Sequence, residues 1–214
     1  MCNLFTQTHV TEAMQRLFGD RLAVASAAEE AAVPGDIYPD GRAVLVRPAG
    51  EGEAPGLVLD RGRWGMPTPA VYLEGRRTDR GVTNVRNTGS AHWRRWLGPE
   101  HRCLVPFARF AEPGPGGVPV WFSTADGGPA FLAGITTVWT SVRRLREGET
   151  TDRLFAFLTC PPNAEVAAVH PKAMPVILTR PDEWETWLGA PWPIAALMQR
   201  PLGDGLLQAG RAPA

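Results

Sequence analysis

Extended apolar segments with little helical pattern dominate the middle of this 214-residue sequence. Four candidate strands, rich in β-branched and aromatic residues, follow one another between glycine- and proline-containing turns. They are RCLVPFARFAEP at 102–113, VPVWFST at 118–124, AFLAGITTVWT at 130–140 and RLFAFLTCPP at 153–162. Strands joined by short turns pair antiparallel, so this half of the chain predicts a mostly antiparallel sheet.

The remaining elements are shorter and do not alternate regularly with the strands. Further strands are predicted at 43–46, 57–60, 82–88 and 174–179, and helices at 8–20, 90–98, 180–189 and 192–201, with one helical turn within 162–171. Strands outnumber helices and there is no internal repeat, which favours a single α+β domain. We expect this domain to span residues 1–200 and residues 201–214 to form a partly disordered tail.

Composition excludes several classes of protein. Hydrophobic residues make up 44% and charged residues 21% of the chain, as in soluble globular proteins. No apolar run approaches the ~20 residues of a membrane span, and the N-terminus lacks the features of a secretory signal. Three cysteines without a CxxC pair and four histidines without zinc-like spacing predict no metal and no cofactor. We expect a cytoplasmic protein with reduced cysteines, and the apolar settings of Cys103 and Cys160 predict small buried hydrophobes.

The net charge of zero conceals a basic segment. Between residues 61 and 102 there are nine arginines and three carboxylates, which leaves this segment near +6. Such a block forms either a basic face for phosphates or a solvated loop region, and charge alone does not decide between them. The nine are Arg61, Arg63, Arg76, Arg77, Arg80, Arg86, Arg94, Arg95 and Arg102.

A cysteine directly follows the initiator methionine. Removal of Met1 leaves an α-amine and a thiol on Cys2, and these groups titrate near ~8 and ~8.5. A 1,2-aminothiol condenses with an aldehyde to a five-membered thiazolidine, which an internal cysteine cannot form. The plainer alternative is that position 2 merely tolerates cysteine.

Four segments in order resemble one known family. They are Cys2 at the start, NVRNT at 84–88, RCLVPFARFAEP at 102–113 and NAEVAAVHPKAMPVIL at 163–178. Together they resemble the SRAP (SOS response-associated peptidase) family, abasic-site sensors that crosslink to single-stranded DNA through an N-terminal cysteine. The resemblance covers residues 1 to about 190 and implies a barrel-like core of mostly antiparallel sheet with flanking helices.

The resemblance also implies a site and a reaction. Cys2 would be the nucleophile, Glu112 the catalytic acid and His170 the catalytic histidine, with Asn84 beside them. The product would be a covalent DNA–protein crosslink, a lyase-like activity within the DNA-damage response, and the family is also described as peptidases, with removal of Met1 by the protein itself as one possibility. The expected partner is abasic single-stranded DNA, bound by a monomer associated with the nucleoid.

A second set of residues is expected to bind the DNA. The resemblance makes Arg86 a DNA contact, since a guanidinium suits a phosphate. Lys172 would act as a point charge, and Trp64, close to the basic block, would stack on a base. Arg76 and Arg77 complete the expected set.

The chain departs from the family's pattern at three points. The family's MCGRF start is MCNLF here, its WGL-[IV]-PxW string is shortened to WGMPTP at 64–69, and Pro113 follows Glu112.

Two other functions also fit Cys2 or the basic block. One alternative is an amidohydrolase of the glutaminase type, which uses the freed amine of an N-terminal cysteine as a base. The other is a non-catalytic module that binds single-stranded DNA. Taken singly, Asn84, Arg86, Glu112 and His170 would be ordinary turn, surface, strand-end and loop residues.

Overall fold

Five strands close into a barrel in the computed structural model, which describes residues 2–8, 10–29 and 35–210. Around the ring, β4 (Arg42–Pro48) pairs with β5 (Leu57–Trp64), β5 with β11 (Glu149–Cys160), β11 with β10 (Phe131–Val142), β10 with β7 (Arg102–Pro106), and β7 with β4. Only the β5–β11 pairing in this ring is parallel. Closure removes the unpaired edges of an open sheet.

The barrel interior is filled by apolar side chains. Leu45, Leu59 and Phe155 are fully buried. Position 62 of β5 must be glycine, because a Cβ there would lie 2.8 Å from both Leu45 Cδ2 and Phe155 Cδ1. The missing side chain lets the barrel close tightly around its core.

Short strands extend the barrel along β5, β10 and β11. β2 (Leu22–Val24) pairs in parallel with β5, and β6 (Asn84–Val85) pairs in parallel with β11 beyond the end of β5. β12 (Met174–Pro175) pairs with the other edge of β11, and β13 (Ile177–Leu178) pairs with β10. The two ends of β11 therefore lie in different surroundings, and its C-terminal end is flanked by β6 and β12.

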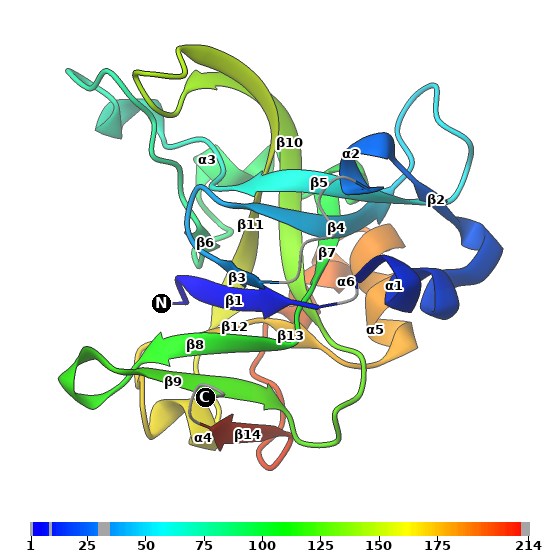
Figure 1. Ribbon diagram of the computed structural model, residues 1–214, viewed down its shortest axis with the longest axis vertical. Helices are drawn as coiled ribbons and strands as arrows, with labels where there is room; N and C mark the ends of the chain where they lie inside the picture. The colour runs from blue at the N-terminus through cyan, green and yellow to red at the C-terminus, as the bar shows by residue number, and fades with distance from the viewer. Residues whose placement is uncertain (1, 9, 30–34, 211–214) are drawn as a thin grey trace.

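A second, antiparallel sheet lies beside the barrel (Figure 1). Its order is β14 (Leu207–Gly210), β9 (Pro119–Thr124), β8 (Arg109–Pro113), β1 (Leu4–Gln7) and β3 (Gly35–Ile37). Phe5 of β1 is fully buried, and its ring centroid lies 5.1 Å from that of Trp64 and 6.1 Å from that of Phe157. These contacts join the sheet to the barrel in one core, so that β1 carries the start of the chain against the barrel.

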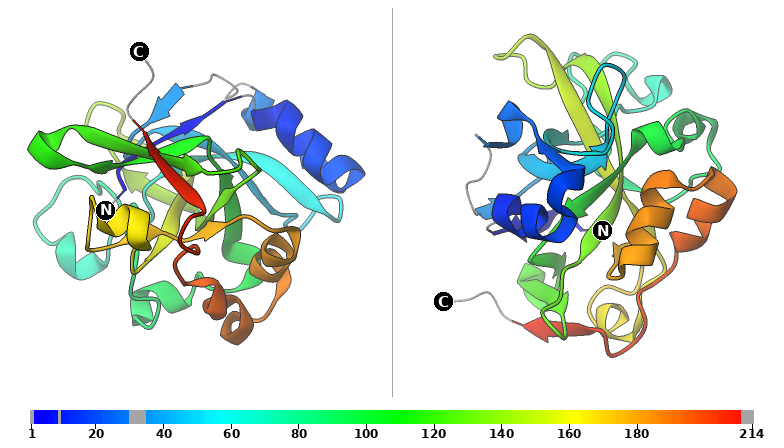
Figure 2. Two further views of the ribbon diagram at one scale, coloured as in Figure 1. Left: turned by 90° about the horizontal axis from the view of Figure 1, so that it is seen from below. Right: turned by 90° about the vertical axis from the view of Figure 1, so that its right-hand side faces the viewer.

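Helices cover the outside of the two sheets (Figure 2). The side chain of Ser90 caps α3 and that of Asn163 caps α4. Both residues therefore satisfy backbone N–H groups that a helix start leaves unpaired. The α-helices are α1 (Val10–Phe18), α2 (Ser26–Glu29), α3 (Ala91–Arg94), α4 (Ala164–Ala167), α5 (Pro181–Gly189) and α6 (Trp192–Ala195). Short 3₁₀ turns are η1 (Gly19–Arg21), η2 (Ala70–Tyr72), η3 (Pro99–His101), η4 (Pro115–Gly117) and η5 (Ala196–Met198).

The predicted α+β class with a barrel-like antiparallel core is confirmed, but two predicted strands divide. Residues 102–113 form β7 and β8 in different sheets, because the chain turns at 107–108, where the Ala108 N–H donates to the Thr6 carbonyl over 2.9 Å. Residues 174–179 form β12 and β13 around Val176, which hydrogen-bonds to both β11 and β10.

The C-terminal segment also differs from the prediction. Residues 207–210, expected within a partly disordered tail, form β14 and pair with β9. Residues 211–214 lie outside the described residues. Within the described part of the chain, no helix has the length and apolar character that crossing a membrane requires.

Candidate active site at the N-terminal cysteine

Cys2 lies immediately before β1, buried against the end of β8. Leu4 pairs with Ala111 in antiparallel register, which brings the start of the chain beside Glu112. The Cys2 side chain is fully buried, and its Sγ donates a hydrogen bond of 3.4 Å to the Leu4 carbonyl. Burial raises the pKa of the thiol well above its usual value, and the negative charge of Glu112 raises it further. The thiol is therefore protonated at neutral pH.

Asn84 connects β6 to Cys2. Its Nδ2 donates to the Cys2 carbonyl over 2.9 Å and to Thr83 Oγ1 over 2.9 Å. Its Oδ1 is buried and accepts no hydrogen bond from any described residue. Since a buried acceptor without a donor is costly, this oxygen is a position where an incoming N–H or O–H group would be stabilised.

Glu112 is a buried carboxyl in β8. Only 1% of its surface is exposed, and its strand pairs with β1 on one side and β9 on the other. Burial raises the pKa of Glu112 above its usual range, against an opposing effect of His170. The neutral acid is thus favoured over a wider pH range than for a solvated glutamate.

His170 follows α4 and is held by a turn before β12. Its backbone N–H donates to the Val166 carbonyl, and its Nδ1 lies 2.9 Å from the Ala173 carbonyl oxygen. A carbonyl only accepts, so this contact assigns a proton to Nδ1. Nδ1 also lies 3.7 Å from Glu112 Oε2. The side chain is 15% exposed, so the imidazole lies at the border between the buried carboxyl and solvent.

The structure therefore brings Cys2, Asn84, Glu112 and His170 together from four separate segments of the chain. Arg86 lies beside them, at the exit of β6, and its Nη1 donates to the Lys172 carbonyl over 2.7 Å. Lys172 is exposed in the same turn as His170.

The predicted basic face is only partly present, because two of its arginines are buried. Arg102 is fully buried and donates to the carbonyls of Leu97, Trp187 and Ala190. Arg63 is paired with carboxylates, namely those of Asp40, Glu147 and Asp152. Both guanidiniums serve the interior of the fold and are unavailable to phosphates.

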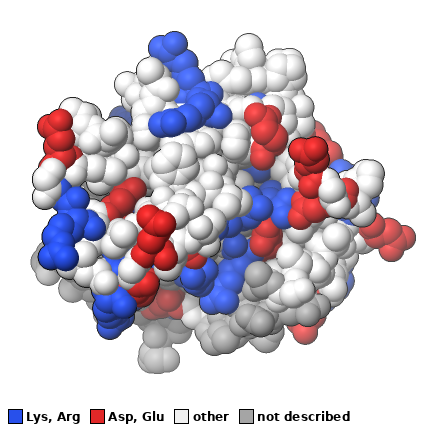
Figure 3. Space-filling view, turned by 90° about the horizontal axis from the view of Figure 1, so that it is seen from above, with Lys and Arg blue, Asp and Glu red and all other residues white. Residues whose placement is uncertain are grey.

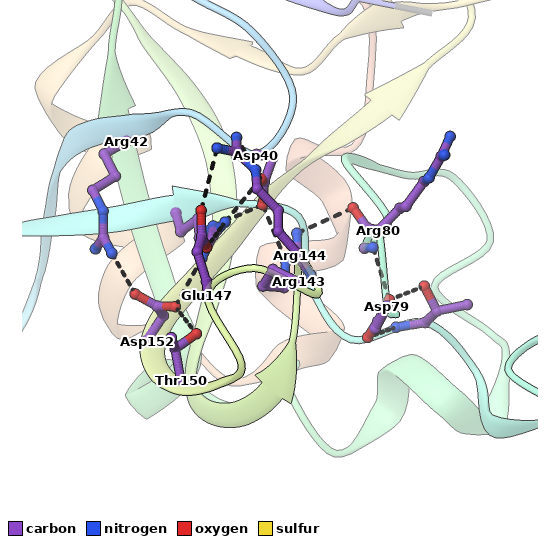
Figure 4. A network of polar contacts seen from close by, with 12 residues as sticks. Asp40, Arg42, Asp79, Arg80, Arg143, Arg144, Glu147, Thr150 and Asp152 are labelled. Atoms are coloured by element: carbon purple, nitrogen blue, oxygen red, sulfur yellow. Dashed lines mark hydrogen bonds and ion pairs between the residues drawn. The ribbon is translucent and has the colours of Figure 1, made fainter. Parts of the chain in front are cut away.

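Arg63 is part of a larger network near the turn that connects β10 to β11 (Figure 4). There Asp40 also accepts from Arg143 and Arg144, and Asp152 accepts from Arg42. In the space-filling view of the upper face, basic and acidic side chains are interspersed instead of forming one basic field (Figure 3). This part of the surface is close to electrically balanced.

The exposed arginines of the predicted block lie nearer the site. Arg76 and Arg80 are exposed and line a groove of about 470 Å³ that also includes Asn84. Arg77 is exposed beside Arg76. The groove thus connects basic side chains with the polar centre that contains Cys2.

The prediction that Trp64 stacks on a base is wrong. Its side chain is fully buried in the barrel, its Nε1 donates to the Thr83 carbonyl, and its ring packs on Phe5 and Phe157. An exposed aromatic residue that the sequence analysis missed is Tyr72, which is 64% exposed and lines the groove. Its position three residues after the WGMPTP string, within the basic segment, was the available signal.

In the described part of the chain, no three His, Cys, Asp or Glu side chains lie close enough together to hold a metal ion.

A barrel that buries Cys2 next to an asparagine, a buried carboxyl and an imidazole defines a protein with a candidate covalent or acid–base site. The model of the SOS response associated peptidase (SRAP) family matches residues 1–206. The chain belongs to this family, and the family resemblance inferred from the sequence is confirmed.

Three solved structures with the same fold are similar to this chain over most of its length. A protein from Bordetella bronchiseptica is 22% identical with a TM-score of 0.72, with all of both chains covered. A phage-related protein from the same organism is 19% identical with a TM-score of 0.65, with coverage of 100% of this chain and 95% of that one. A protein from Bacteroides thetaiotaomicron is 17% identical with a TM-score of 0.62, with coverage of 95% and 82%. At these identities the likeness establishes the fold alone. A search of curated protein sequences found no match.

Proposed function

We propose that this protein binds single-stranded DNA at abasic sites and forms a covalent thiazolidine crosslink between Cys2 and the aldehyde of the ring-opened sugar. The observation that carries the proposal is the convergence of the Cys2 thiol with Asn84, Glu112 and His170. Membership of a family described by its association with the SOS response agrees with a role in DNA damage. The crosslink would shield the abasic site.

Removal of Met1 is the first requirement. With Met1 attached, the nitrogen of Cys2 is part of a peptide bond and is not nucleophilic. Cleavage of that bond creates an α-amine next to Asn84, whose buried Oδ1 would accept a hydrogen bond from it. The Asn84 Nδ2 bond to the Cys2 carbonyl holds the same residue from the other side.

The crosslinking reaction then consists of a condensation and a ring closure. The amine attacks the aldehyde carbon, and the resulting carbinolamine loses its hydroxyl as water to give an imine. The sulfur of Cys2 next forms a bond to the imine carbon while its proton passes to the nitrogen. One water is released and no atom changes its oxidation state, so no external oxidant or reductant is required.

Glu112 and His170 would handle the protons of these steps. Loss of water from the carbinolamine needs an acid, and burial favours the protonated form of Glu112. The thiol is also protonated and needs a base when the ring closes. The carboxylate formed by the first step provides one, and the partly exposed His170 would exchange protons with solvent.

The groove next to Asn84 suits the strand on which the abasic sugar lies. Tyr72 offers an exposed ring for the neighbouring base, and Arg76 and Arg80 offer charges for its phosphate. Arg77, Arg86 and Lys172 are further exposed cations at the edges of this region. Stacking requires an unpaired base, which favours single strands, and we propose that a monomer suffices.

The experiment is incubation of the purified protein with a single-stranded oligonucleotide that contains one abasic site. The proposal predicts an adduct that survives heating on a denaturing gel. Its mass should equal that of the protein without Met1 plus the oligonucleotide minus one water. An undamaged oligonucleotide should give no adduct, and glutaminase turnover without any adduct would favour the amidohydrolase alternative.

A further inference from the structure

Gln199 lies outside the segments that carry the candidate catalytic groups, yet its side chain connects three of the surrounding elements. Its Nε2 donates to the Arg86 carbonyl over 2.8 Å and to the Thr159 carbonyl over 3.0 Å. Its Oε1 accepts from Thr88 Oγ1 over 3.0 Å. Both amide hydrogens and the amide oxygen are therefore engaged with fixed partners.

The first two partners lie on neighbouring segments, because β6 pairs in parallel with β11. Arg86 follows β6, which begins at Asn84, and Thr159 lies near the end of β11. Thr159 and Cys160 pair with Pro175 and Met174 of β12, the strand that directly follows the turn of His170. Gln199 thus ties the exit of the Asn84 strand to the base of the His170 turn.

Arg86 completes the connection through its side chain. Its Nη1 donates to the Lys172 carbonyl, and the next carbonyl along the chain, that of Ala173, accepts from Nδ1 of His170. The guanidinium therefore holds the middle of the turn while β12 holds its end. A displacement of the Arg86 backbone would move the Lys172 carbonyl, and with it the imidazole.

We infer that Gln199 is a positioning residue for His170, acting through the backbone and guanidinium of Arg86. The inference rests on the proposed function, because it concerns the proton transfers assigned to His170. It also gives Arg86 a second task beyond attraction of phosphate. We call the hydrogen bonds of Gln199, together with that of the Arg86 guanidinium, the clamp. Small displacements of a catalytic group have large effects on rate, so loss of the clamp would slow crosslinking even though Gln199 touches neither DNA nor Cys2.

The test begins with Gln199→Met, which keeps the length of the side chain and removes all three hydrogen bonds without adding charge. Gln15→Met, on an exposed position of α1, is the matched control. Single-turnover crosslinking to abasic single-stranded DNA is followed at saturating DNA across the pH range in which histidine titrates. We expect Gln199→Met to crosslink about tenfold more slowly, with a flatter pH profile, and Gln15→Met to match the wild type.

A second comparison distinguishes positioning from a general loss of structure. In the His170→Ala background, Gln199→Met should slow crosslinking no further, because the group that it positions is already gone. Multiplicative effects of the two substitutions, or a wild-type rate for Gln199→Met, would overturn the inference.

Two further results keep the outcomes separable. If Gln199→Met does not fold, Thr88→Val removes a single hydrogen bond of the clamp and should give a smaller effect of the same kind. An unaltered rate and pH profile in Thr88→Val would then count against the clamp. If the wild-type protein forms no crosslink at all, the proposed function fails, and that result is distinct from a failure of the clamp.

Discussion

Nδ1 of His170 lies 3.7 Å from Oε2 of Glu112. His170 follows α4, whereas Glu112 lies in β8, the central strand of the five-stranded sheet. The carboxyl is buried and the imidazole is partly exposed. Burial raises the pKa of Glu112, and a charge on His170 acts in the opposite direction. The pair thus connects a buried acid with the partly exposed imidazole of His170.

Glu112→Gln should make the protein more stable and less active. The raised folded-state pKa of Glu112 means that ionisation at higher pH destabilises the folded state, a cost that glutamine does not carry. Below the ordinary pKa of glutamate both the folded and the unfolded wild type are protonated, and the advantage of glutamine disappears. The gain in melting temperature over wild type should therefore grow from acidic to neutral pH, while crosslinking slows by about 10²-fold through loss of the acid.

Glu100→Gln, at an exposed glutamate, is the control for this measurement. It should leave both the melting temperature and its pH dependence close to those of wild type. If the gain in melting temperature of Glu112→Gln over wild type stayed constant or shrank as pH rises, the carboxyl would not be held in its neutral form.

His170→Ala should slow crosslinking and flatten its dependence on pH. Because a proton shuttle serves both directions of a reaction, reversal of a preformed adduct should slow as well. Lys172→Ala, two residues away, should chiefly weaken binding of DNA. Single-turnover time courses at saturating DNA check this, and a His170→Ala variant with the wild-type rate and pH profile would reduce His170 to a loop residue.

The groove beside Asn84 predicts separate effects of stacking and of charge on DNA affinity. Tyr72→Ala should weaken binding of single strands about tenfold, whereas Tyr72→Phe should bind normally because the ring is kept. Arg76→Ala and Arg80→Ala should each lower the slope of log affinity against log salt by about 0.7. Titrations at several salt concentrations measure both effects, and equal salt slopes in all variants would place the DNA elsewhere.

The loop that carries the groove depends on glycine at position 81. A Cβ at Gly81 would lie 2.6 Å from Nη1 of the buried Arg143 and 2.8 Å from the Gly65 carbonyl oxygen, at a backbone φ of +76°. Gly81→Ala should destabilise the protein by about 1–3 kcal/mol through strain and displacement of Arg143. Gly75→Ala has a similar φ of +70° but no neighbouring atom within 4 Å, so it should cost clearly less. Equal melting temperatures for the two variants would contradict this packing argument.

The sequence predicted the fold class because its strands are long, apolar and joined by recognisable turns. β10 and β11 agree with their predicted segments to within a few residues. The division of residues 102–113 was missed, since one apolar run gives no sign that a chain passes from the barrel to another sheet. β14 was missed because its partner β9 is distant in sequence and its four residues, LQAG, include no β-branched or aromatic side chain.

The motifs of the sequence predicted which residues gather at the candidate site. They did not predict which arginine and aromatic side chains are buried. The four segments that contain Cys2, Asn84, Glu112 and His170 meet as the family resemblance implied. Arginines were counted as one basic block, but Arg102 turned inward to bond three carbonyls. Trp64 was misplaced and Tyr72 was missed for a similar reason, because composition does not tell which aromatic ring the barrel encloses.

The central claim is that the N-terminal aminothiol of Cys2 forms the bond to DNA. Three cysteines are present, and Cys103 and Cys160 are buried in the core. Cys2→Ala, Cys160→Ala and a variant with one extra residue that remains between Met1 and Cys2 form a matched set. The extra residue keeps the thiol but moves the α-amine away from it.

Each variant is incubated with abasic single-stranded DNA, and the heat-stable adduct is quantified on a denaturing gel and weighed by mass spectrometry. The account predicts wild-type adduct yield from Cys160→Ala and no adduct from Cys2→Ala or from the extended chain. The adduct mass should lack Met1 and one water. A normal adduct yield from Cys2→Ala or from the extended chain would contradict a thiazolidine at Cys2.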